Sequence, residues 1–290
     1  MDTKKFKVLE QAVALGSLSK ASEKFGYTQS ATTQMMKTLE NEIGFPVLAK
    51  SHQGVQLTSD GSKIMPAIRA LLNSEEALQQ EINFIRHIEK GSLRIGTFLS
   101  CSINWLPEII RVFQYDYPLI KLELVEGGDD ELDQQLINGE IDLAFSSLHG
   151  QTSVDFIPLV IDDIVAIVPP NHKFYHYDTI HLDDLNGQPF ILSDKTFDRD
   201  IHRILRNNHI HPDVKFVSQN GIAIIAMVDK GLGISLLPSL ILKSYQGNAR
   251  SIPLDPVQSR KLGILVRSVS QMSPAMKAFI HCTKRVLLKE

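Results

Sequence analysis

The stretch SLSKASEKFGYTQSATTQMMKTLENEIG, from Ser17 to Gly44, places two short helical patterns on either side of a glycine. Ser19 is expected to cap the first helix, and Gly26 to end it, because glycine adopts the left-handed conformation without strain. Thr28 is expected to cap the second helix, which closes at Gly44. Two helices joined by a short turn that contains glycine form a helix-turn-helix arrangement.

The second helix has two chemically different faces. Its inward face is predicted to comprise Ala31, Met36, Leu39 and Ile43, with Thr32 beside them. Its outward face comprises Gln29, Ser30, Thr33, Gln34 and Lys37. Glutamine pairs with adenine, threonine contacts the thymine methyl group, and lysine reaches guanine or phosphate, so this face suits the major groove of DNA. The alternative is the solvated face of a small helical bundle.

Neighbouring segments predict contacts with the DNA backbone. The first helix would lie across the backbone, and two short strands, at 47–48 and 55–57, would flank a polar tip as a wing. The residues expected to contact phosphates or the minor groove are Ser17, Ser19, Lys20, Thr28, Lys50 and His52. Residues 1–58 hold seven lysines against five acidic residues, although the whole chain has a net charge of −3. This local excess of positive charge gives only weak support for nucleic acid as a partner.

A long helix is predicted from Thr58, as its cap, to about Glu89. Its apolar residues recur in steps of three and four, at Ile64, Ile68, Leu71, Leu78, Ile82 and Ile85. That spacing is typical of a coiled-coil seam, and hence of a dimerising helix. Pro66 is expected to kink it, because proline removes a backbone hydrogen bond. The alternative is an amphipathic helix packed on its own domain.

From residue 90 onward, strand-like and helix-like runs alternate, which predicts an α/β unit with a parallel sheet and covering helices. Short polar segments lie where several of these strands end, and we expect them to line a small-molecule cleft. The candidate effector-binding residues are Ser100, Cys101, Ser102, Gly128, Ser146, Ser147, Ser193 and Asn220. Each serine taken alone is better explained as an ordinary helix cap or turn residue, and only their occurrence together at equivalent strand ends favours a cleft.

The charge of such a ligand is left open by the sequence. Ser100 to Ser102 lie between a strand and a helix, where hydroxyls and free backbone N–H groups would provide an anion site. Asp129, Asp130 and Asp194 lie nearby in the predicted cleft and would oppose a strongly anionic ligand.

Other chemistries are poorly supported. Cys101 is explained either as a buried inert thiol or as a low-pKa thiolate at a helix N-terminus. The histidines at 172, 176, 181, 202, 209 and 211 lack the tight spacing of a metal site, so no metal or cofactor is expected. The glycine and serine motifs of nucleotide-binding enzymes and hydrolases are missing, and with them any sign of an enzyme.

The two cysteines exclude a disulfide framework, and no run of about 18 apolar residues predicts a membrane helix. We therefore expect a cytoplasmic protein without membrane contact.

Several residues at fixed spacing together resemble the winged helix-turn-helix of LysR-type transcriptional regulators. The matching residues are Phe6, Gly16-Ser17-Leu18-Ser19-Lys20-Ala21-Ser22, Thr28-Gln29-Ser30-Ala31-Thr32-Thr33, Leu39-Glu40, Gly44, Val47-Leu48-Ala49-Lys50 and Leu57-Thr58-Ser59-Asp60-Gly61. The resemblance continues in order through LRIGTF, LPEIIRVFQYDYP, LINGEIDLAF, VAIVPPNHKF and VDKGLGISLLP. Ser30, Thr32, Gln34 and Lys50 depart from the usual proline, valine, basic residue and arginine, which points to an unusual operator preference.

The resemblance implies a multidomain regulator of transcription. It would have a winged helix-turn-helix at 1–58, a linker and dimerisation helix at 59–89, and an α/β effector domain at 90–290. The effector domain would consist of two subdomains resembling periplasmic binding proteins, one at 92–161 with 268–290 and the other at 162–267.

The family also implies partners. They are pseudo-palindromic double-stranded DNA, a small-molecule effector bound in the cleft, and other copies of the chain in a homotetramer, with RNA polymerase as a further candidate. The rival interpretation is a solute-binding module whose N-terminal helices only mediate assembly.

Overall fold

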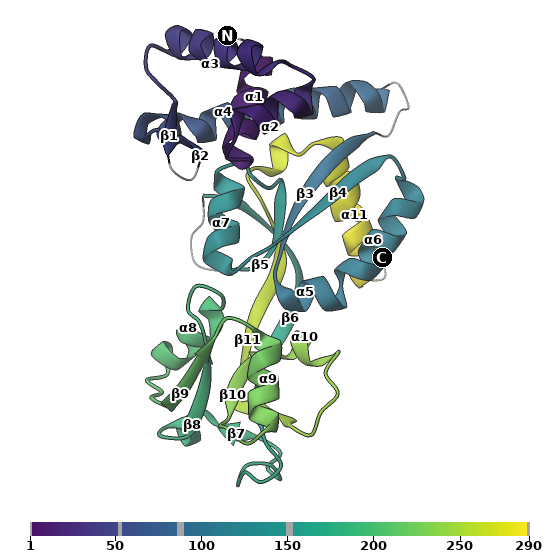
Figure 1. The fold of residues 1–290 in the computed structure, drawn as a ribbon. Helices are drawn as coiled ribbons and strands as arrows, with labels where there is room; N and C mark the ends of the chain where they lie inside the picture. Colours follow the sequence, from purple (N-terminus) through teal and green to yellow (C-terminus); the bar gives the residue numbers. More distant parts are fainter. Residues whose placement is uncertain (1, 52–53, 86–89, 149–152, 289–290) are drawn as a thin grey trace. The chain divides into compact units, whose positions relative to one another are not determined.

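The computed structural model describes residues 2–51, 54–85, 90–148 and 153–288. The chain forms two compact units (Figure 1). The first comprises the residues up to Ile82 together with 138–140, and the second comprises 83–137 and 141–290. Among the described residues, no helix is both long and apolar enough to cross a membrane.

The first unit begins with three helices, α1 (Thr3–Ala14), α2 (Leu18–Phe25) and α3 (Gln29–Ile43). The cap of α2 is Ser17 and not Ser19, because Ser17 is the extended residue whose hydroxyl accepts a hydrogen bond from Lys20 N at 3.3 Å. Gly26 ends α2 at φ 69°, and Thr28 caps α3 by accepting from Ala31 N at 3.2 Å. The helix-turn-helix prediction therefore holds, apart from the position of the first cap.

The core of this unit gathers apolar side chains from all of its helices. It contains Phe6, Val8, Leu9, Met36, Leu39, Val47, Met65, Ile68 and Leu72. Thr32 is fully buried on the same face of α3. Ala31, predicted to face inward, is exposed, because it lies in the first turn of α3, at the rim of the buried stripe.

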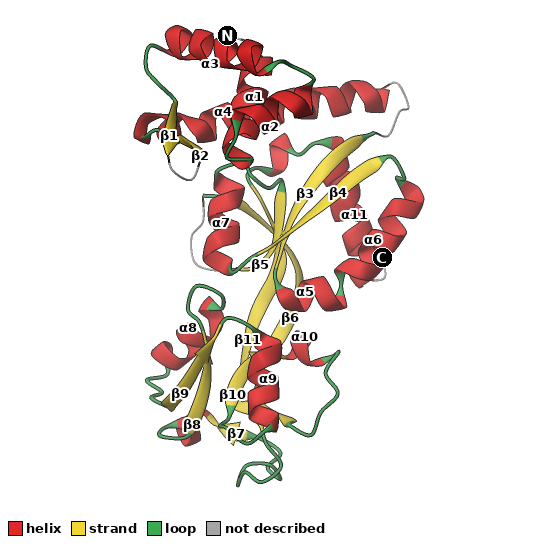
Figure 2. Ribbon diagram, in the orientation of Figure 1, coloured by secondary structure: helices red, strands yellow, loops and turns green. Residues whose placement is uncertain are grey.

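The wing is a two-stranded antiparallel sheet of β1 (Leu48–Ser51) and β2 (Gly54–Leu57) (Figure 2). Its second strand packs closely on the turn after α1, where Val55 N donates to Gly16 O at 2.9 Å. A Cβ atom at Gly54 would lie 2.2 Å from that carbonyl oxygen, and Gly54 has φ 108°. Only glycine allows this approach without displacing the backbone.

Helix α4 (Ser59–Ile85) is continuous and includes Pro66. Its N-terminal half packs on the core through Met65, Ile68 and Leu72. Another side of the helix, from Leu71 onward, displays apolar side chains to solvent, namely Leu71, Leu78, Ile82 and Ile85, which are 39 to 70% exposed. Part of the helix thus packs on its own unit, as the alternative interpretation expects, whereas dimerisation through the exposed apolar residues stays a prediction. The predicted end at Glu89 lies outside the described residues.

The second unit is built on a mixed sheet of seven strands. Its strands are β3 (Gly91–Thr97), β4 (Ile120–Glu126), β5 (Leu143–Ser147), β6 (Asp155–Val168), β7 (Ile180–His181), β10 (Ser235–Pro238) and β11 (Arg250–Val266). They follow the order β10-β6-β11-β5-β3-β4, with β7 beside β11. A separate parallel pair is formed by β8 (Pro189–Ser193) and β9 (Asp213–Ser218).

The expectation of a purely parallel sheet is wrong. Strands β3, β4 and β5 are parallel, but β6 and β11 pair antiparallel with each other, and β11 is also antiparallel to β5. The two long strands continue from the part with β3–β5 to the part with β8–β10 (Figure 1). The short apolar runs at 164–168 and 262–266 are only the buried ends of β6 and β11.

Helices cover these strands on both sides. They are α5 (Leu99–Asn104), α6 (Leu106–Asp116), α7 (Asp129–Ile137), α8 (Arg199–Asn207), α9 (Gly221–Asp229), α10 (Ser239–Leu242) and α11 (Pro274–Leu288). One large core surrounds Phe113, Phe145 and Phe279, and another surrounds Phe174 and Phe190. The unit therefore has two large hydrophobic centres, joined by β6 and β11, with smaller clusters beside them.

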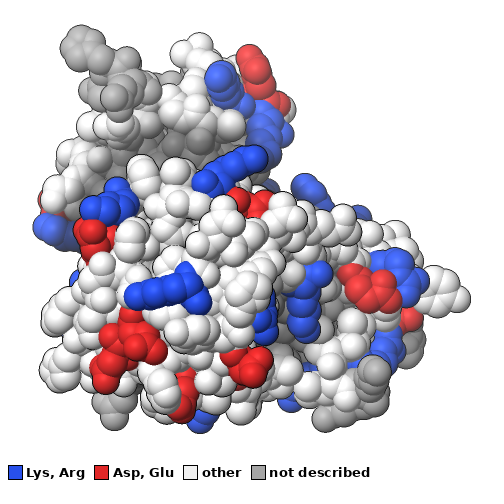
Figure 3. Space-filling model, turned by 90° about the horizontal axis from the view of Figure 1, so that it is seen from below, with Lys and Arg blue, Asp and Glu red and all other residues white. Residues whose placement is uncertain are grey.

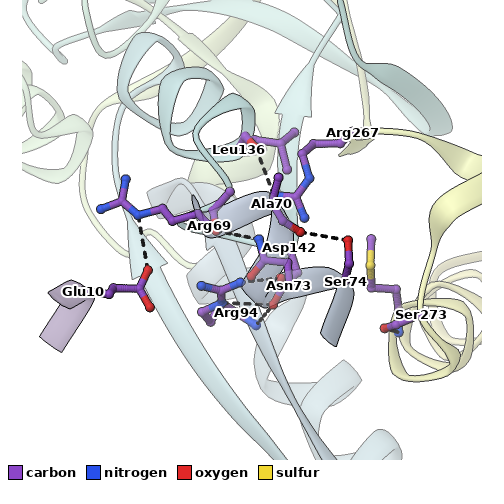
Figure 4. A network of polar contacts seen from close by, with 12 residues as sticks. Glu10, Arg69, Ala70, Asn73, Ser74, Arg94, Leu136, Asp142, Arg267 and Ser273 are labelled. Atoms are coloured by element: carbon purple, nitrogen blue, oxygen red, sulfur yellow. Dashed lines mark hydrogen bonds and ion pairs between the residues drawn. The ribbon is translucent and has the colours of Figure 1, made fainter. Parts of the chain in front are cut away.

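Ion pairs and hydrogen bonds secure each unit separately (Figure 4). In the second unit, Arg94 of β3 donates to both carboxylate oxygens of Asp142, with Nη2 at 2.7 Å from Oδ1, and Arg267 donates to Leu136 O at 3.4 Å. In the first unit, Arg69 of α4 donates to Glu10 of α1 at 3.3 Å.

Candidate nucleic-acid interface and ligand cavity

The outer face of α3 has the side chains that the sequence assigned to base contacts. Gln29, Ser30, Gln34 and Lys37 are exposed, and Thr33 is half-buried. The Thr33 hydroxyl donates to Gln29 O at 2.8 Å, so its methyl group is the part left for an apolar contact. The opposite face is anchored in the core, so the exposed side chains project from a helix of fixed orientation.

The residues assigned to backbone contacts are only partly free. The hydroxyls of Ser17 and Thr28 serve as helix caps. Lys20 is exposed and makes no ion pair with any residue that the structure describes, and the same is true of Lys37. By contrast, Lys7 pairs with Glu75 at 3.3 Å. Ser19 is half-buried in α2, and His52 and the side chain of Lys50 lie outside the described part.

The second unit contains a cavity of about 390 Å³. Of the predicted effector residues, Ser100, Ser193 and Asn220 line it. Gly127 lines it in place of the predicted Gly128. A Cβ atom at Gly128 would lie 2.4 Å from Thr196 O, so Gly128 instead permits the close approach of the loop that precedes α8.

The remaining predicted residues lie away from the cavity lining. Cys101 is fully buried in the larger core, and this burial raises the pKa of its thiol well above the ordinary value. Ser102 donates to Thr97 Oγ1 at 3.4 Å, Ser146 to Ser147 O at 3.2 Å, and Ser147 to Asp200 at 2.6 Å. These hydroxyls are therefore engaged inside the protein.

The predicted anion site at the start of α5 is not formed as expected. The N–H groups of Cys101 and Ser102 both donate to Phe98 O at 3.0 Å, so they are not free for a ligand.

Arg260 of β11 is the cavity residue that sequence reasoning missed. Its side chain is 7% exposed, and its Nε and Nη2 atoms lie 3.1 and 3.0 Å from Asp162 Oδ2. Nη2 also donates to Ser100 Oγ at 3.2 Å, and the guanidinium lies 5.0 Å from the centre of the Phe98 ring. Arg260 is surrounded in sequence by polar residues, QSRK, so no local pattern marks it as buried.

Asp198 is the second missed residue. It caps α8, and its carboxylate accepts from Asp200 N at 3.1 Å and from Ile201 N at 3.2 Å. Burial raises the pKa of Asp198 to about 6; Arg260 lowers it, whereas the carboxylates of Asp129 and Asp200 raise it further.

The surface seen in Figure 3 carries both signs of charge. Lysine and arginine are interspersed there with aspartate and glutamate among more numerous uncharged residues. This face therefore has no broad positive patch of the kind that follows a nucleic-acid backbone. Among the described residues, no group of three His, Cys, Asp or Glu side chains is arranged to hold a metal ion.

A winged helix-turn-helix unit and an α/β unit with a partly open cavity are together the arrangement of a DNA-binding transcriptional regulator with an effector-binding domain. Two family models match the chain: "Bacterial regulatory helix-turn-helix protein, lysR family" over residues 3–62, and "LysR substrate binding domain" over residues 86–288. The chain belongs to the LysR family of transcriptional regulators.

Individual relatives agree with this assignment. The HTH-type transcriptional regulator YvbU of Bacillus subtilis (strain 168) is 26% identical over 291 residues, which cover 99% of both chains. The structure of a full-length OxyR variant from Pseudomonas aeruginosa has a TM-score of 0.79 at 20% identity and covers 99% of this chain and 95% of its own. The effector-binding domain of QuiR in complex with shikimate has a TM-score of 0.61 at 23% identity and covers 69% of this chain and 99% of its own.

Proposed function

We propose that this regulator reads its operator with the outer face of α3. The observation that carries the proposal is that Gln29, Gln34 and Lys37 are exposed on a helix whose opposite face is buried in the core. The helix is also capped at both ends, by Thr28 at its N-terminus and by Gly44 at its C-terminus. Amide side chains recognise adenine through two hydrogen bonds, and such a pair discriminates only when the helix that bears it is rigid. Lys20, exposed on α2, would contact phosphate and set the register.

Two copies would pair through the exposed stripe of α4. Leu71, Leu78, Ile82 and Ile85 present apolar area to solvent at the spacing of a coiled-coil seam. Pairing two recognition helices in this way matches the two half-sites of a pseudo-palindrome. A tetramer formed from two such dimers would hold two operator sites and raise the effective concentration of each dimer at the second site.

The effector would bind in the cavity beside Arg260. This cavity is lined by Phe98, Ser100 and Asp129 from the part with β3–β5 and by Ser193, Asn220 and Ile224 from the part with β8–β10, so a ligand would contact both parts. The QuiR domain, which shares the fold, was crystallised with a small molecule. A ligand alters DNA binding only if it favours one arrangement of the subunits over another.

Selection of bound sequences from a random double-stranded DNA library, with the purified full chain at moderate salt, tests this function. We expect enrichment of an inverted repeat whose half-sites lie about one or two helical turns apart. Recovery of unrelated sequences, together with binding that disappears as salt rises, would contradict base reading by α3 and leave only an electrostatic contact. That outcome would favour a solute-binding module whose N-terminal helices mediate assembly.

A further inference from the structure

The cavity carries more negative than positive charge. The ionisable residues of its lining are three acidic ones, Glu126, Asp129 and Asp198, and one basic one, Arg260. Because the cavity lies partly inside the protein, these charges interact more strongly than they would in water. A free Arg260 guanidinium could still bind an anionic ligand. The excess of carboxylates therefore favours a cationic ligand only if the charge of Arg260 is already neutralised.

Arg260 is neutralised from within the protein. Asp162 accepts from two of its nitrogen atoms, and that aspartate is 6% exposed. The other oxygen of Asp162 accepts from Ser239 Oγ at 2.8 Å and from Leu240 N at 2.9 Å, so the carboxylate is fixed in place. A carboxylate ligand at Arg260 would therefore approach a guanidinium whose charge is already balanced by a buried partner.

Two of the helix N-termini at the cavity, those of α8 and α9, are also occupied by groups of the protein. At α8, Arg199 N donates to Asp129 Oδ2 at 3.2 Å, and the next two N–H groups donate to Asp198. At α9, the Asn220 side chain accepts from Ile222 N at 2.9 Å and from Ala223 N at 3.2 Å. These helices offer few free donors to an anion.

Two carboxylates meet where α8 begins. The Asp129 carboxylate accepts a hydrogen bond from the backbone N–H of Arg199, the first residue of α8. Asp198 directly precedes Arg199 in the chain, so both carboxylates belong to the start of α8. Asp129 is 7% exposed. Burial raises the pKa of Asp198; Arg260 lowers it, and the charge of Asp129 raises it further, in keeping with two carboxylates placed near one point.

Ser193 provides independent evidence for a ligand at this place. Its side chain lines the cavity, it is 5% exposed, and its hydroxyl has no hydrogen-bond partner among the described residues. A buried hydroxyl without a partner costs free energy, and a ligand that donates or accepts there recovers that cost. Ser193 is the last residue of β8, and Asp198 follows it in the loop before α8.

Most of the remaining lining is apolar. It consists largely of Phe98, Leu99, Phe197, Ile224, Leu237 and Ile241. Such a surface fits a compact hydrocarbon or aromatic body, with the polar group of the ligand held at one end.

We propose that the effector cavity is selective for an organic amine: a small apolar body that bears a protonated amino group, held by Asp129 and Asp198 with Ser193 as a further hydrogen-bond partner. This inference rests on the proposed function, in which the cavity is the effector site. The ammonium ion supplies three donors, which suit two carboxylates and a hydroxyl.

Calorimetric titration of the full chain with matched pairs of compounds tests the selectivity. The probes are 2-phenylethylamine against 3-phenylpropionate, 2-cyclohexylethylamine against 3-cyclohexylpropionate, and tryptamine against indole-3-propionate, all at pH 7.5. We expect binding within the amine series, with each bound amine favoured over its carboxylate by at least about tenfold. Equal or tighter binding of the carboxylates, or failure of every amine to bind at millimolar concentration, would overturn the proposal.

Substitutions locate the contact. Asp129→Asn and Asp198→Asn retain an acceptor oxygen for the helix N–H groups, so both variants should fold. Each substitution should lower the affinity for the bound amine by about tenfold or more, and the double variant should no longer prefer amines to carboxylates. Asp184→Asn, an exposed residue of the 3₁₀ helix Leu182–Leu185 away from the lining, is the matched control and should bind unchanged. Amine binding that survives in the double variant would overturn the assignment of these carboxylates.

Failure here is distinguishable from failure of the proposed function. DNA selection needs no effector, so an enriched inverted repeat together with absent amine binding would remove only the ligand class. Amine binding without an enriched DNA motif would instead contradict base recognition by α3 and support the assignment of the cavity.

Discussion

The carboxylate of Glu40, in the last turns of α3, accepts a hydrogen bond from the backbone N–H of Val47 at 2.9 Å. The same oxygen accepts from Leu48 N at 3.1 Å. Val47 lies just before the wing strand β1, and it is fully buried. One side chain thus fixes the position of the wing relative to the recognition helix, which explains why leucine and glutamate occur together at 39 and 40: the first fills the core and the second holds the wing.

Glu40→Ala should loosen this connection. Two backbone N–H groups would lose a charged acceptor, and we expect a loss of about 1–3 kcal/mol in the free energy of unfolding, measured by urea denaturation. Affinity for the selected operator should fall at the same time. Glu23→Ala, an exposed residue of α2, serves as the control. A Glu40→Ala chain with unchanged stability and operator affinity would show that the wing is held by other contacts.

Thr32→Val should stabilise the protein. Thr32 is fully buried in α3, and its hydroxyl has no partner among the described residues. Valine has nearly the same shape without the polar atom, so the gain should be about 1 kcal/mol. Thr38→Val is the contrasting control, because the Thr38 hydroxyl donates to Gln34 O at 2.8 Å and would lose that bond. A lower melting temperature for Thr32→Val would contradict the absence of a partner.

Gln29→Ala and Lys20→Ala should affect DNA binding in different ways. Loss of a base contact should relax sequence preference at one position, at a cost of about 1–3 kcal/mol on the selected operator. Loss of a phosphate contact should weaken binding to all sequences alike and reduce the slope of log affinity against log salt by about one. Fluorescence anisotropy on operator and scrambled duplexes separates the two. Equal losses on both duplexes for Gln29→Ala would remove Gln29 as a base reader.

Local signals explain why the N-terminal unit was predictable from the sequence. Gly26, Thr28 and Gly44 determine where α2 ends and where α3 begins and ends, through conformations and caps that each residue specifies on its own. The distinction between Ser17 and Ser19 as cap was not predictable in this way. Both hydroxyls suit a helix start, and only the extended backbone of Ser17 decides between them.

The ligand cavity was predictable only in part, because its polar residues are brought together by distant segments. Ser100, Ser193 and Asn220 lie at or just after strand ends, a position that the sequence reveals. The buried partner of Arg260 is Asp162, which lies 98 residues away in the sequence. The antiparallel course of β6 and β11 that joins them is a property of the whole sheet, and the apolar periodicity of either strand does not encode it.

Asp198→Asn should change how stability depends on pH. The pKa of Asp198 is about 6 in the folded chain, against an ordinary value of 3.8. The folded state therefore binds the proton more tightly, so this residue lowers stability as pH rises from about 4 to 6, and its cost is complete above pH 6. Asparagine keeps the cap and removes that cost, so we expect a gain of about 1–2 kcal/mol at pH 7 and little change at pH 4.

Urea denaturation of both chains between pH 4 and 8 measures this effect. Asp184→Asn controls for the loss of one surface charge. A variant whose gain is the same at pH 4 and pH 7 would show that the raised pKa of Asp198 is not its source.

Leu78→Arg should separate the subunits of the oligomer. Leu78 is 61% exposed in the part of α4 beyond the core of its own unit, so its substitution should leave the fold intact. A pair of arginines at one coiled-coil layer would bring like charges together in an apolar seam, which destabilises pairing. Sedimentation velocity should show a shift to smaller species, and operator affinity should fall because one half-site is then held alone. Glu76→Arg introduces the same side chain about 200° around the helix and should leave the assembly unchanged. An oligomer that persists with Leu78→Arg would place the subunit contact elsewhere.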